Sequence, residues 1–135
     1  MSLHRPGITS WRTGTAAVEL ALCMPIMVVV VFGTIEACNS IFLKETATSA
    51  AYEASKICTG TGGTEYAARL RVDEILSSSE IVEGVLVFDP PLFESWERGK
   101  LITATVSIPT SNNLGGIKMF YDGHVLPGRV TMVKL

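Results

Sequence analysis

The sequence predicts an α+β fold in which a long N-terminal helix packs on a small antiparallel β-sheet. Apolar residues recur with helical spacing in the first part of the chain, whereas two later segments alternate between apolar and polar residues. Spacings near 3.6 residues are typical of helices, and a period of two is typical of half-buried strands. A glycine-rich stretch, residues 59–63, separates the two kinds of pattern and predicts the end of the long helix.

The long helix contains a segment that is apolar enough to cross a bilayer. Residues 20–35 carry no charge, and the apolar character extends over residues 15–43. About 25 helical residues at about 1.5 Å each cross a hydrocarbon core of about 30 Å. The charge-free part alone is short for this distance, so we expect Glu19 and Glu36 to lie near the two interfaces.

The charges that flank the apolar segment favour one orientation. Arg5 and Arg12 precede it without any acidic residue, whereas lysines and glutamates alternate after it. Cytoplasmic flanks carry an excess of Lys and Arg, so the sequence predicts a cytoplasmic N-terminus and an exported C-terminal part. A cleaved secretory signal is the competing interpretation. It would have a shorter apolar region followed by a small-residue cleavage site, as at residues 47–51, but these lie well beyond the apolar run.

A motif marks both ends of the apolar segment. Its parts are Arg12-Thr13-Gly14, Ala16-Ala17-Val18-Glu19, Pro25 and Phe32-Gly33-Thr34-Ile35-Glu36. In residues 12–36 the chain resembles the TadE-like family, pseudopilins or minor pilins of the bacterial tight-adherence (Tad) pilus apparatus. The similarity continues through residues 50–56, where the arginine usual in the family is missing. Beyond residue 60 only the general plan, a pilin-like α+β domain, is similar.

The resemblance implies processing at the start of the motif. A membrane aspartyl prepilin peptidase would cleave between Gly14 and Thr15, where glycine allows close approach to an extended backbone. Cleavage would remove Arg5 and Arg12, leave 9 basic residues against 13 acidic ones, and change the net charge from −2 to −4. We therefore expect a leader at 1–14, a transmembrane helix at 15–42, an exported stalk helix at 43–58 and a small α+β domain at 59–135.

Glu19 is the main candidate for assembly. A carboxylate near the edge of the hydrocarbon is costly, and intramembrane ionisable residues are functional hypotheses by default. Glu19 would pair with the Thr15 amine of a neighbouring subunit or with a cation on the assembly platform. The alternative is an interfacial residue at a helix start, where the helix dipole favours an anion.

Three further features of the segment are candidates for assembly or helix packing. Pro25 removes a backbone hydrogen bond, so we expect a kink, which is either neutral or softens the helix for entry into a filament. Gly33 and Ala37 form a small-xxx-small contact at which another helix could pack. Glu36 lies on a different face from Glu19 and is either an interfacial residue or a ligand or ion-pair partner.

The remaining elements are predicted from periodicity and turn residues. A narrow helical stripe is formed by Ile41, Ala47, Ala51, Ala54 and Ile57 or Cys58. A second helix is expected at 64–76, with Thr64 as N-cap and with Tyr66, Leu70 and Ala67 facing inward. Strands are expected at 85–88, 100–108 and 129–135, with another at 117–121 and a hairpin-type turn at residues 122–123. Trp96 and Phe93 would cover an edge of the sheet or, alternatively, form a binding platform.

The sequence gives little support for catalysis, metal binding or nucleic-acid binding. It has two histidines, His4 and His124, and no Cys/His cluster with metal-ligand spacing. Glu80 and Glu83 flank a short segment without the pattern of a calcium loop. There is no basic patch for nucleic acid. We expect no enzyme activity and no cofactor.

The three cysteines do not predict a disulfide scaffold. Cys23 and Cys38 are expected to act as small apolar residues of the anchor. Cys58 lies about 30 Å further along a continuous helix than Cys38, so these two cannot bond within one chain. Cys58 is either a buried or free thiol, or an intermolecular partner or lipid site.

The predicted function follows from the resemblance. It implies a pseudopilin or minor pilin that helps prime, cap or anchor a Tad-type pilus. Its implied partners are other pseudopilins and the major pilin, the prepilin peptidase, the inner-membrane platform and the lipid bilayer. The alternatives are an uncleaved, membrane-anchored assembly or secretion factor that never enters a filament, and an exported small-molecule binding module.

Overall fold

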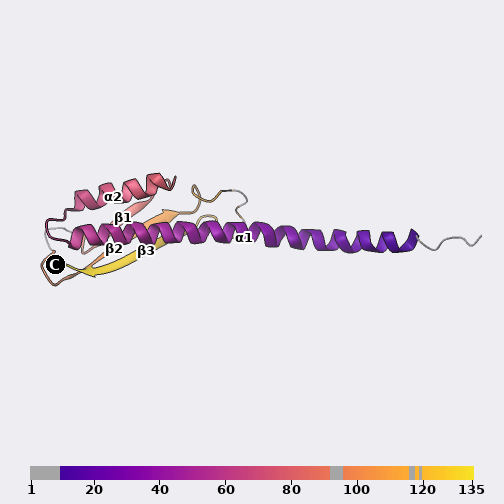
Figure 1. Cartoon of the computed structure of the whole chain (residues 1–135), viewed down its shortest axis with the longest axis horizontal. Helices are drawn as coiled ribbons and strands as arrows, with labels where there is room; N and C mark the ends of the chain where they lie inside the picture. Colours follow the sequence, from indigo (N-terminus) through magenta and orange to yellow (C-terminus); the bar gives the residue numbers. More distant parts are fainter. Residues whose placement is uncertain (1–9, 92–95, 116–117, 119) are drawn as a thin grey trace, which may run out of the picture. The chain divides into compact units, whose positions relative to one another are not determined.

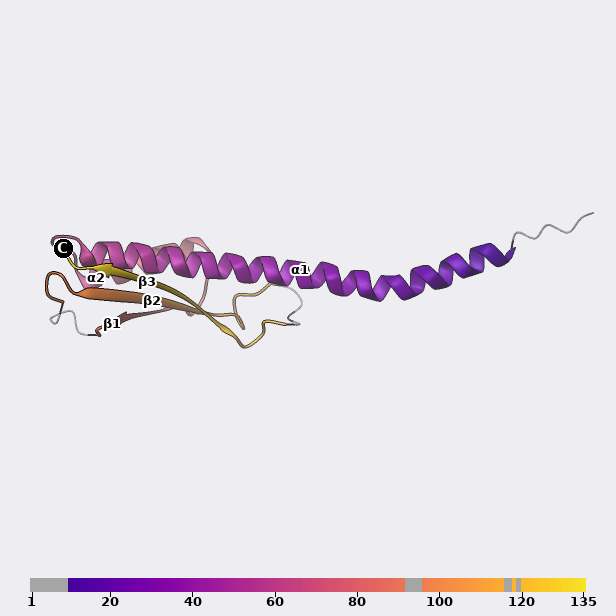
Figure 2. The same cartoon turned by 90° about the horizontal axis from the view of Figure 1, so that it is seen from below.

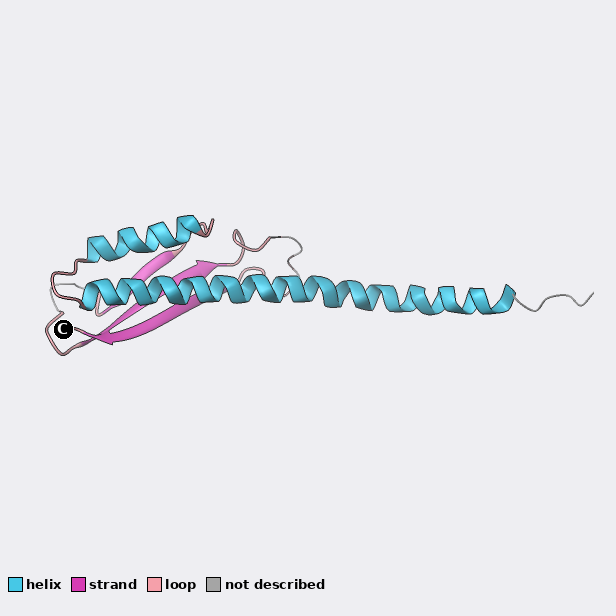
Figure 3. Ribbon diagram, in the orientation of Figure 1, coloured by secondary structure: helices cyan, strands magenta, loops and turns pink. Residues whose placement is uncertain are grey.

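The protein is described by a computed structural model that covers residues 10–91, 96–115, 118 and 120–135. The elements in chain order are α1 (Ser10–Thr59), α2 (Glu65–Ser78), β1 (Val85–Asp89), β2 (Leu101–Pro109) and β3 (Val125–Val133) (Figure 1). Within this described part the strands form one antiparallel sheet with the order β1-β2-β3 (Figure 3). A long N-terminal apolar helix with a small antiparallel sheet is the α+β fold that the sequence predicts.

The chain divides into two compact units, Met1–Ile35 and Glu36–Leu135. In the first unit, every described side chain from residue 14 to residue 32 is exposed, including Leu22 and Ile26. Among the described residues, α1 is the one helix with the length and apolar composition to cross a membrane. Water is a poor solvent for such a surface, so the first unit needs lipid or other apolar surroundings.

Pro25 lies inside the helical part of the first unit. Figure 2 shows α1 bending in its indigo part, which belongs to this unit and contains the proline. A proline inside a helix removes one backbone hydrogen bond and crowds the preceding turn, which explains the bend that the sequence predicts.

The second unit is a two-layer α+β domain. Residues 36–59 of α1, together with α2, cover one face of the sheet (Figure 2). The buried side chains of β2 are the alternating set Ile102, Ala104, Val106 and Ile108, each fully buried. This face is the one that the period of two predicts for the strand. From β1 the buried residues Leu86 and Phe88 pair with Val106 and Ala104.

The buried stripe of α1 consists mainly of small residues. It is formed by Leu43, Ala47, Ala50, Ala51, Ala54 and Cys58, so most of the predicted stripe is correct. The prediction for Ile41 is wrong, because this residue lies on another side of the helix and is 59% exposed. Small side chains allow the helix axis to lie close to the sheet, and Gly128 of β3 is part of that contact.

The last strand begins earlier than expected, because its pairing with β2 starts at Val125 and includes Gly128. β3 begins at Val125 and ends at Val133, whereas alternation predicts a strand at 129–135. Pro127 and Gly128 look like a break in sequence, but β3 is an edge strand, where proline is tolerated. A Cβ atom on Gly128 would lie 2.2 Å from the backbone carbon of Ala47, so only glycine fits where β3 crosses α1.

The connection between β2 and β3 differs from the prediction. The described residues at 118, 120 and 121 are not in a strand, and the backbone amides of Phe120 and Tyr121 are bound by the Glu36 side chain rather than by a neighbouring strand. Asp122 and Gly123 form a turn just before β3, at the end of a long connection rather than at the tip of a two-residue hairpin.

The second helix, α2, has the predicted position, but the face that it buries against the rest of the domain differs from the predicted one. Thr64 is its N-cap, and the Thr64 hydroxyl accepts a hydrogen bond from the Ala67 amide at 3.2 Å. The buried residues are Ala68, Val72 and Leu76, whereas Tyr66, Leu70 and Ala67 are exposed. The prediction that those three face inward was wrong. The helix face that carries Tyr66 and Leu70 continues into polar residues such as Asp73 and Ser77, so it is not apolar along its length. The helix face that carries Ala68 continues with Val72 and Leu76 and stays apolar.

The C-terminus closes the end of α1. The Lys134 ammonium donates hydrogen bonds to the carbonyl oxygens of Cys58, at 2.6 Å, and Gly60, at 3.3 Å. The Leu135 amide donates to the Thr59 carbonyl at 3.1 Å. A cation and an amide thus bind carbonyl groups that a helix end leaves without intrahelical partners. The helix ends at Thr59, the first residue of the glycine-rich stretch, as predicted.

Candidate functional site

The sequence-predicted processing and assembly residues all lie on α1. Gly14, Thr15, Glu19 and Pro25 are exposed in the first unit, and Gly33 is half-buried there. Glu36 and Ala37 belong to the second unit, where Glu36 is buried and Ala37 is half-buried. A Cβ atom on Gly14 would meet no atom within 4 Å.

Glu19 is a carboxylate on an otherwise apolar, exposed surface. Within the described part of the first unit it is the only acidic residue, and the neighbouring apolar side chains Val18 and Leu20 are 60% and 58% exposed. In apolar surroundings an ionised carboxylate without a partner is strongly unfavourable. The position therefore suits contact with a cationic group of another molecule.

Glu36 has a different environment, which sequence reasoning did not find. Its side chain is 2% exposed, although it is a carboxylate directly after the apolar run. The carboxylate accepts hydrogen bonds from the Phe120 amide, at 3.0 and 3.1 Å to its two oxygens, and from the Tyr121 amide at 2.8 Å. Hydrogen bonds from backbone amides to an ionised carboxylate are stronger than neutral ones and compensate for its burial.

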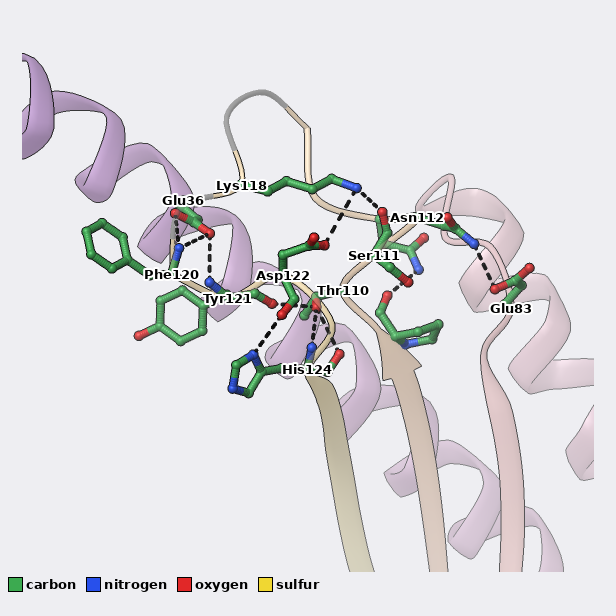
Figure 4. A network of polar contacts seen from close by, with 12 residues as sticks. Glu36, Glu83, Thr110, Ser111, Asn112, Lys118, Phe120, Tyr121, Asp122 and His124 are labelled. Atoms are coloured by element: carbon green, nitrogen blue, oxygen red, sulfur yellow. Dashed lines mark hydrogen bonds and ion pairs between the residues drawn. The ribbon is translucent and has the colours of Figure 1, made fainter.

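This contact joins segments that are 84 and 85 residues apart in sequence. The Phe-Gly-x-x-Glu motif ends at Glu36, which marks the residue as special without showing its partner. Backbone amides have no sequence signature, so no pattern in the chain indicates that the carboxylate binds residues 120 and 121. Figure 4 shows Glu36 directed toward this segment from α1.

Thr110 holds the other side of the same loop. The residue is fully buried at the end of β2, and its amide donates to the His124 carbonyl at 2.9 Å. Its hydroxyl oxygen lies 2.6 Å from the Tyr121 carbonyl and 2.9 Å from the His124 carbonyl, and it accepts from the His124 amide at 3.0 Å. Glu36 and Thr110 thus bind the backbone at residues 120–124 from two elements (Figure 4).

A second set of polar contacts lies beside this loop. The Asn113 side chain accepts from the Val82 amide at 2.7 Å and donates to the carbonyls of Val82 and Pro109 at 2.8 and 2.7 Å. The Asn112 amide donates to the Glu83 carboxylate at 2.8 Å. These bonds fix the residues after β2 against the segment that leads into β1, so they stabilise the loop rather than form a ligand site.

The residues described by the structure contain no group of three or more His, Cys, Asp or Glu side chains that could hold a metal ion. Glu80 and Glu83 both have positive φ, 56° and 63°, which places them in a tight connection. The Glu83 carboxylate accepts the hydrogen bond from the Asn112 side chain described above. The arrangement has the geometry of a structural network.

Cys58 is buried in the core, whereas Cys23 and Cys38 are exposed. Burial raises the pKa of the Cys58 thiol to about 11, with the Lys134 ammonium opposing the shift. The thiolate is the reactive form of cysteine, so Cys58 is protected by both burial and protonation. This environment agrees with the interpretation of Cys58 as a buried thiol.

Trp96 covers an edge of the sheet, which is one of the two roles considered for it. It is 7% exposed, and its ring meets the Phe88 ring edge-on at a centroid distance of 5.0 Å. Its indole nitrogen donates to the Pro90 carbonyl at 2.9 Å. Since Phe88 belongs to the edge strand β1, Trp96 shields that strand from water. The prediction for Phe93 concerns a residue outside the described part of the chain.

Fold and site together define a class of protein. One long apolar N-terminal helix, as in a single-pass membrane protein, is followed by a small α+β domain with a buried carboxylate at its first residue. The family model described as "TadE-like protein" matches residues 14–56, so the chain carries a TadE-like segment there, as residues 12–36 predict. No curated protein and no solved structure matches the chain. The match supports a protein associated with the Tad pilus.

Proposed function

We propose that the protein is a pseudopilin or minor pilin that takes part in assembly of a Tad-type pilus, by priming, capping or anchoring the filament. The observation that carries this proposal is the exposed carboxylate of Glu19 on an apolar helix, five residues after Gly14, where the TadE-like match begins. A carboxylate in this position gains most from a cation supplied by a neighbouring subunit. Its role in this proposal is structural and not catalytic.

The cation would be the amine of Thr15, released when a prepilin peptidase cleaves after Gly14. Two observations support cleavage there. Gly14 and Thr15 are exposed, and space is free around the Gly14 Cα. Both residues lie within α1, so the peptidase must open the first turns of the helix. Glycine lowers the cost of that opening, because it is about 1 kcal/mol less favourable than alanine in a helix.

A retained anchor is also favoured over a cleaved secretory signal. The small residues at 47–51 are the one late cleavage site that the sequence suggests. In the structure Ala47, Ala50 and Ala51 are fully buried against the sheet. Cleavage after residue 51 would remove a large part of the helix that forms the core of the second unit, so this alternative conflicts with the fold.

The proposed location is the cytoplasmic membrane, crossed once, with the N-terminus in the cytoplasm and the α+β domain exported. The basic residues before the apolar segment support this orientation. The proposed partners are other pseudopilins, the major pilin, the prepilin peptidase, the inner-membrane platform and lipid. No nucleic-acid partner is proposed, because the exported part is mildly acidic.

The intact mass of the protein from the membrane of its native host tests this proposal first. A mass that corresponds to a chain beginning at Thr15, with or without N-methylation, supports processing. The full-length mass would remove the amine that Glu19 needs. It would favour the uncleaved, membrane-anchored assembly or secretion factor.

Glu19→Gln tests the assembly step separately from export. We expect normal export and membrane insertion but a loss of the protein from the pilus fraction. Glu45→Gln is the matched control, because Glu45 is an exposed glutamate on the same helix but in the second unit. Normal incorporation of Glu19→Gln would show that this carboxylate has no assembly role.

A further inference from the structure

Two adjacent aromatic residues are exposed on the loop that Glu36 holds. Phe120 is 56% exposed and Tyr121 is 40% exposed, while their backbone amides are bound to the buried carboxylate. Figure 4 shows both rings beside the segment of α1 that carries Glu36. The loop is therefore fixed by its backbone and presents its aromatic side chains outward.

Two exposed apolar residues of α1 follow Glu36 closely. Ile41 is 59% exposed and Phe42 is 51% exposed, and the first charged residue after Glu36 is Lys44. We call Ile41, Phe42, Phe120 and Tyr121 the apolar collar. All four belong to the second unit, at the end where the chain enters it from Ile35.

The length of the apolar run explains why such a collar is needed. Residues 20–35 carry no charge and span about 24 Å as a helix, which is less than the hydrocarbon thickness of about 30 Å. To span this thickness, the helix must place about one more turn in the bilayer, at one end of the run or shared between both ends. At the Glu36 end, the outward side chains as far as Phe42 are uncharged, so the boundary can pass beyond residue 36.

The environment of Glu36 makes this placement possible. A carboxylate directed toward lipid would resist entry into the bilayer. Glu36 is instead buried within the domain, with both oxygens bound by backbone amides. The hydrogen bonds also place the loop at the depth of Glu36. Where the helix enters the interfacial layer, residues 120 and 121 must enter with it.

We propose that the apolar collar is a lipid contact, seated in the interfacial layer of the membrane from which the domain emerges. The proposal rests on the membrane-spanning role of α1 proposed above. Aromatic residues are enriched at this layer because their rings tolerate both the acyl chains and the headgroups. Continuity with the apolar run favours lipid over a protein partner, since the collar begins within two turns of Ile35.

Fluorescence quenching of the full-length protein in vesicles tests the proposal. Single reactive cysteines are labelled with an environment-sensitive dye in vesicles of phosphatidylcholine and phosphatidylglycerol. Vesicles with acyl chains brominated near the headgroup are compared with ordinary ones. The reporters are Phe120→Cys and Phe42→Cys, both with Cys23→Ser and Cys38→Ser, which remove the exposed thiols. The double serine variant measures any background from buried Cys58.

Tyr66→Cys in the same background is the matched control. Tyr66 is an exposed aromatic residue near the C-terminal end of α1, because the nearby Thr64 carbonyl accepts from the Cys58 thiol at 3.9 Å. That end lies about 33 Å from Glu36 along the helix. A second reference keeps Cys23, with Cys38→Ser, and reports the apolar run itself.

We expect the labels at residues 42 and 120 to lose emission in brominated vesicles, as the label on Cys23 does, while the label at residue 66 keeps its emission. Unquenched labels at 42 and 120 beside a quenched Cys23 would overturn the lipid contact and leave the membrane-spanning role intact. That result would assign the collar to water or to a protein surface. An unquenched Cys23 would overturn both proposals.

Discussion

Residues 14–35 and residues 36–59 of α1 are consecutive parts of one helix with opposite relationships to their surroundings. In the first part nearly all side chains are exposed, and many of them are large, such as Leu22 and Ile26. In the second part a stripe of small side chains is buried against the sheet. The two parts also differ in composition, because residues 14–35 carry one charged residue, Glu19, whereas residues 36–59 carry three glutamates and two lysines. In the second part only the stripe of small residues that faces the sheet is apolar and buried.

The same contrast holds for the two glutamates. Glu19 lies on the exposed part and has an environment suited to an intermolecular cation, whereas Glu36 is bound within its own domain. A helix that serves a filament or a membrane must keep its contact groups outward. A helix that serves a domain core must satisfy its polar groups internally. The predictions below test whether this division holds.

The largest effect is expected for Gly128→Val. Its Cβ would lie 2.2–2.4 Å from backbone atoms of Ala47 and Thr48, which cannot move without displacing α1 or β3. We expect a loss of about 3 kcal/mol or more in the free energy of unfolding, at the upper end for overpacking. Thermal unfolding in detergent micelles, followed by circular dichroism, measures it. Gly115→Ala is the control, because its Cβ would meet no atom within 4 Å. Equal melting temperatures for the two variants would contradict the close contact between Gly128 of β3 and the backbone of α1.

Removal of a large core side chain should have the next largest effect. Ile102→Ala leaves a cavity at a fully buried position of β2, with an expected cost of about 2–5 kcal/mol. Ile26→Ala removes the same atoms from a side chain that is 67% exposed in the first unit, so its effect on the unfolding of the domain should stay within about 0.5 kcal/mol. Chemical denaturation of both variants provides the comparison. A similar loss in both would mean that the two parts of α1 are not energetically distinct.

Glu36→Gln should reduce stability by about 1–3 kcal/mol, because the neutral amide loses charge-assisted bonds and directs an NH₂ group at backbone amides. Glu19→Gln should leave the stability of the domain unchanged, since Glu19 is exposed in the other unit. Hydrogen exchange at the Phe120 and Tyr121 amides gives a local measurement beside the melting temperature. Unchanged exchange in Glu36→Gln would show that the carboxylate does not hold the loop.

Sequence patterns predicted those features that depend on local chemistry. The N-cap at Thr64, the end of α1 at the glycine-rich stretch and the buried face of β2 all follow from rules that act within a few residues. Two of the features that were missed depend on distant partners. The start of β3 depends on pairing with β2, with Gly128 fitting closely against α1, and the role of Glu36 depends on amides 84 and 85 residues away. The functional candidates Gly14, Thr15, Glu19 and Pro25 remain predictions from the motif.

The smallest expected effect concerns Cys58 and appears only at alkaline pH. Burial raises the pKa of this thiol from 9.0 to about 11 in the folded protein. Between these values the folded state binds more protons than the unfolded state, so stability is unchanged below pH 9 and falls as the pH rises toward 11. Between about pH 8 and about pH 10 the loss should be about 1 kcal/mol. Cys58→Ala is the control, since it retains all other titrating groups, and the difference between the two pH profiles isolates the thiol. Parallel profiles would mean that the thiol ionises as easily in the folded domain as in the unfolded chain. That result would contradict the tight packing of this part of α1, on which the contrast with the exposed first part depends.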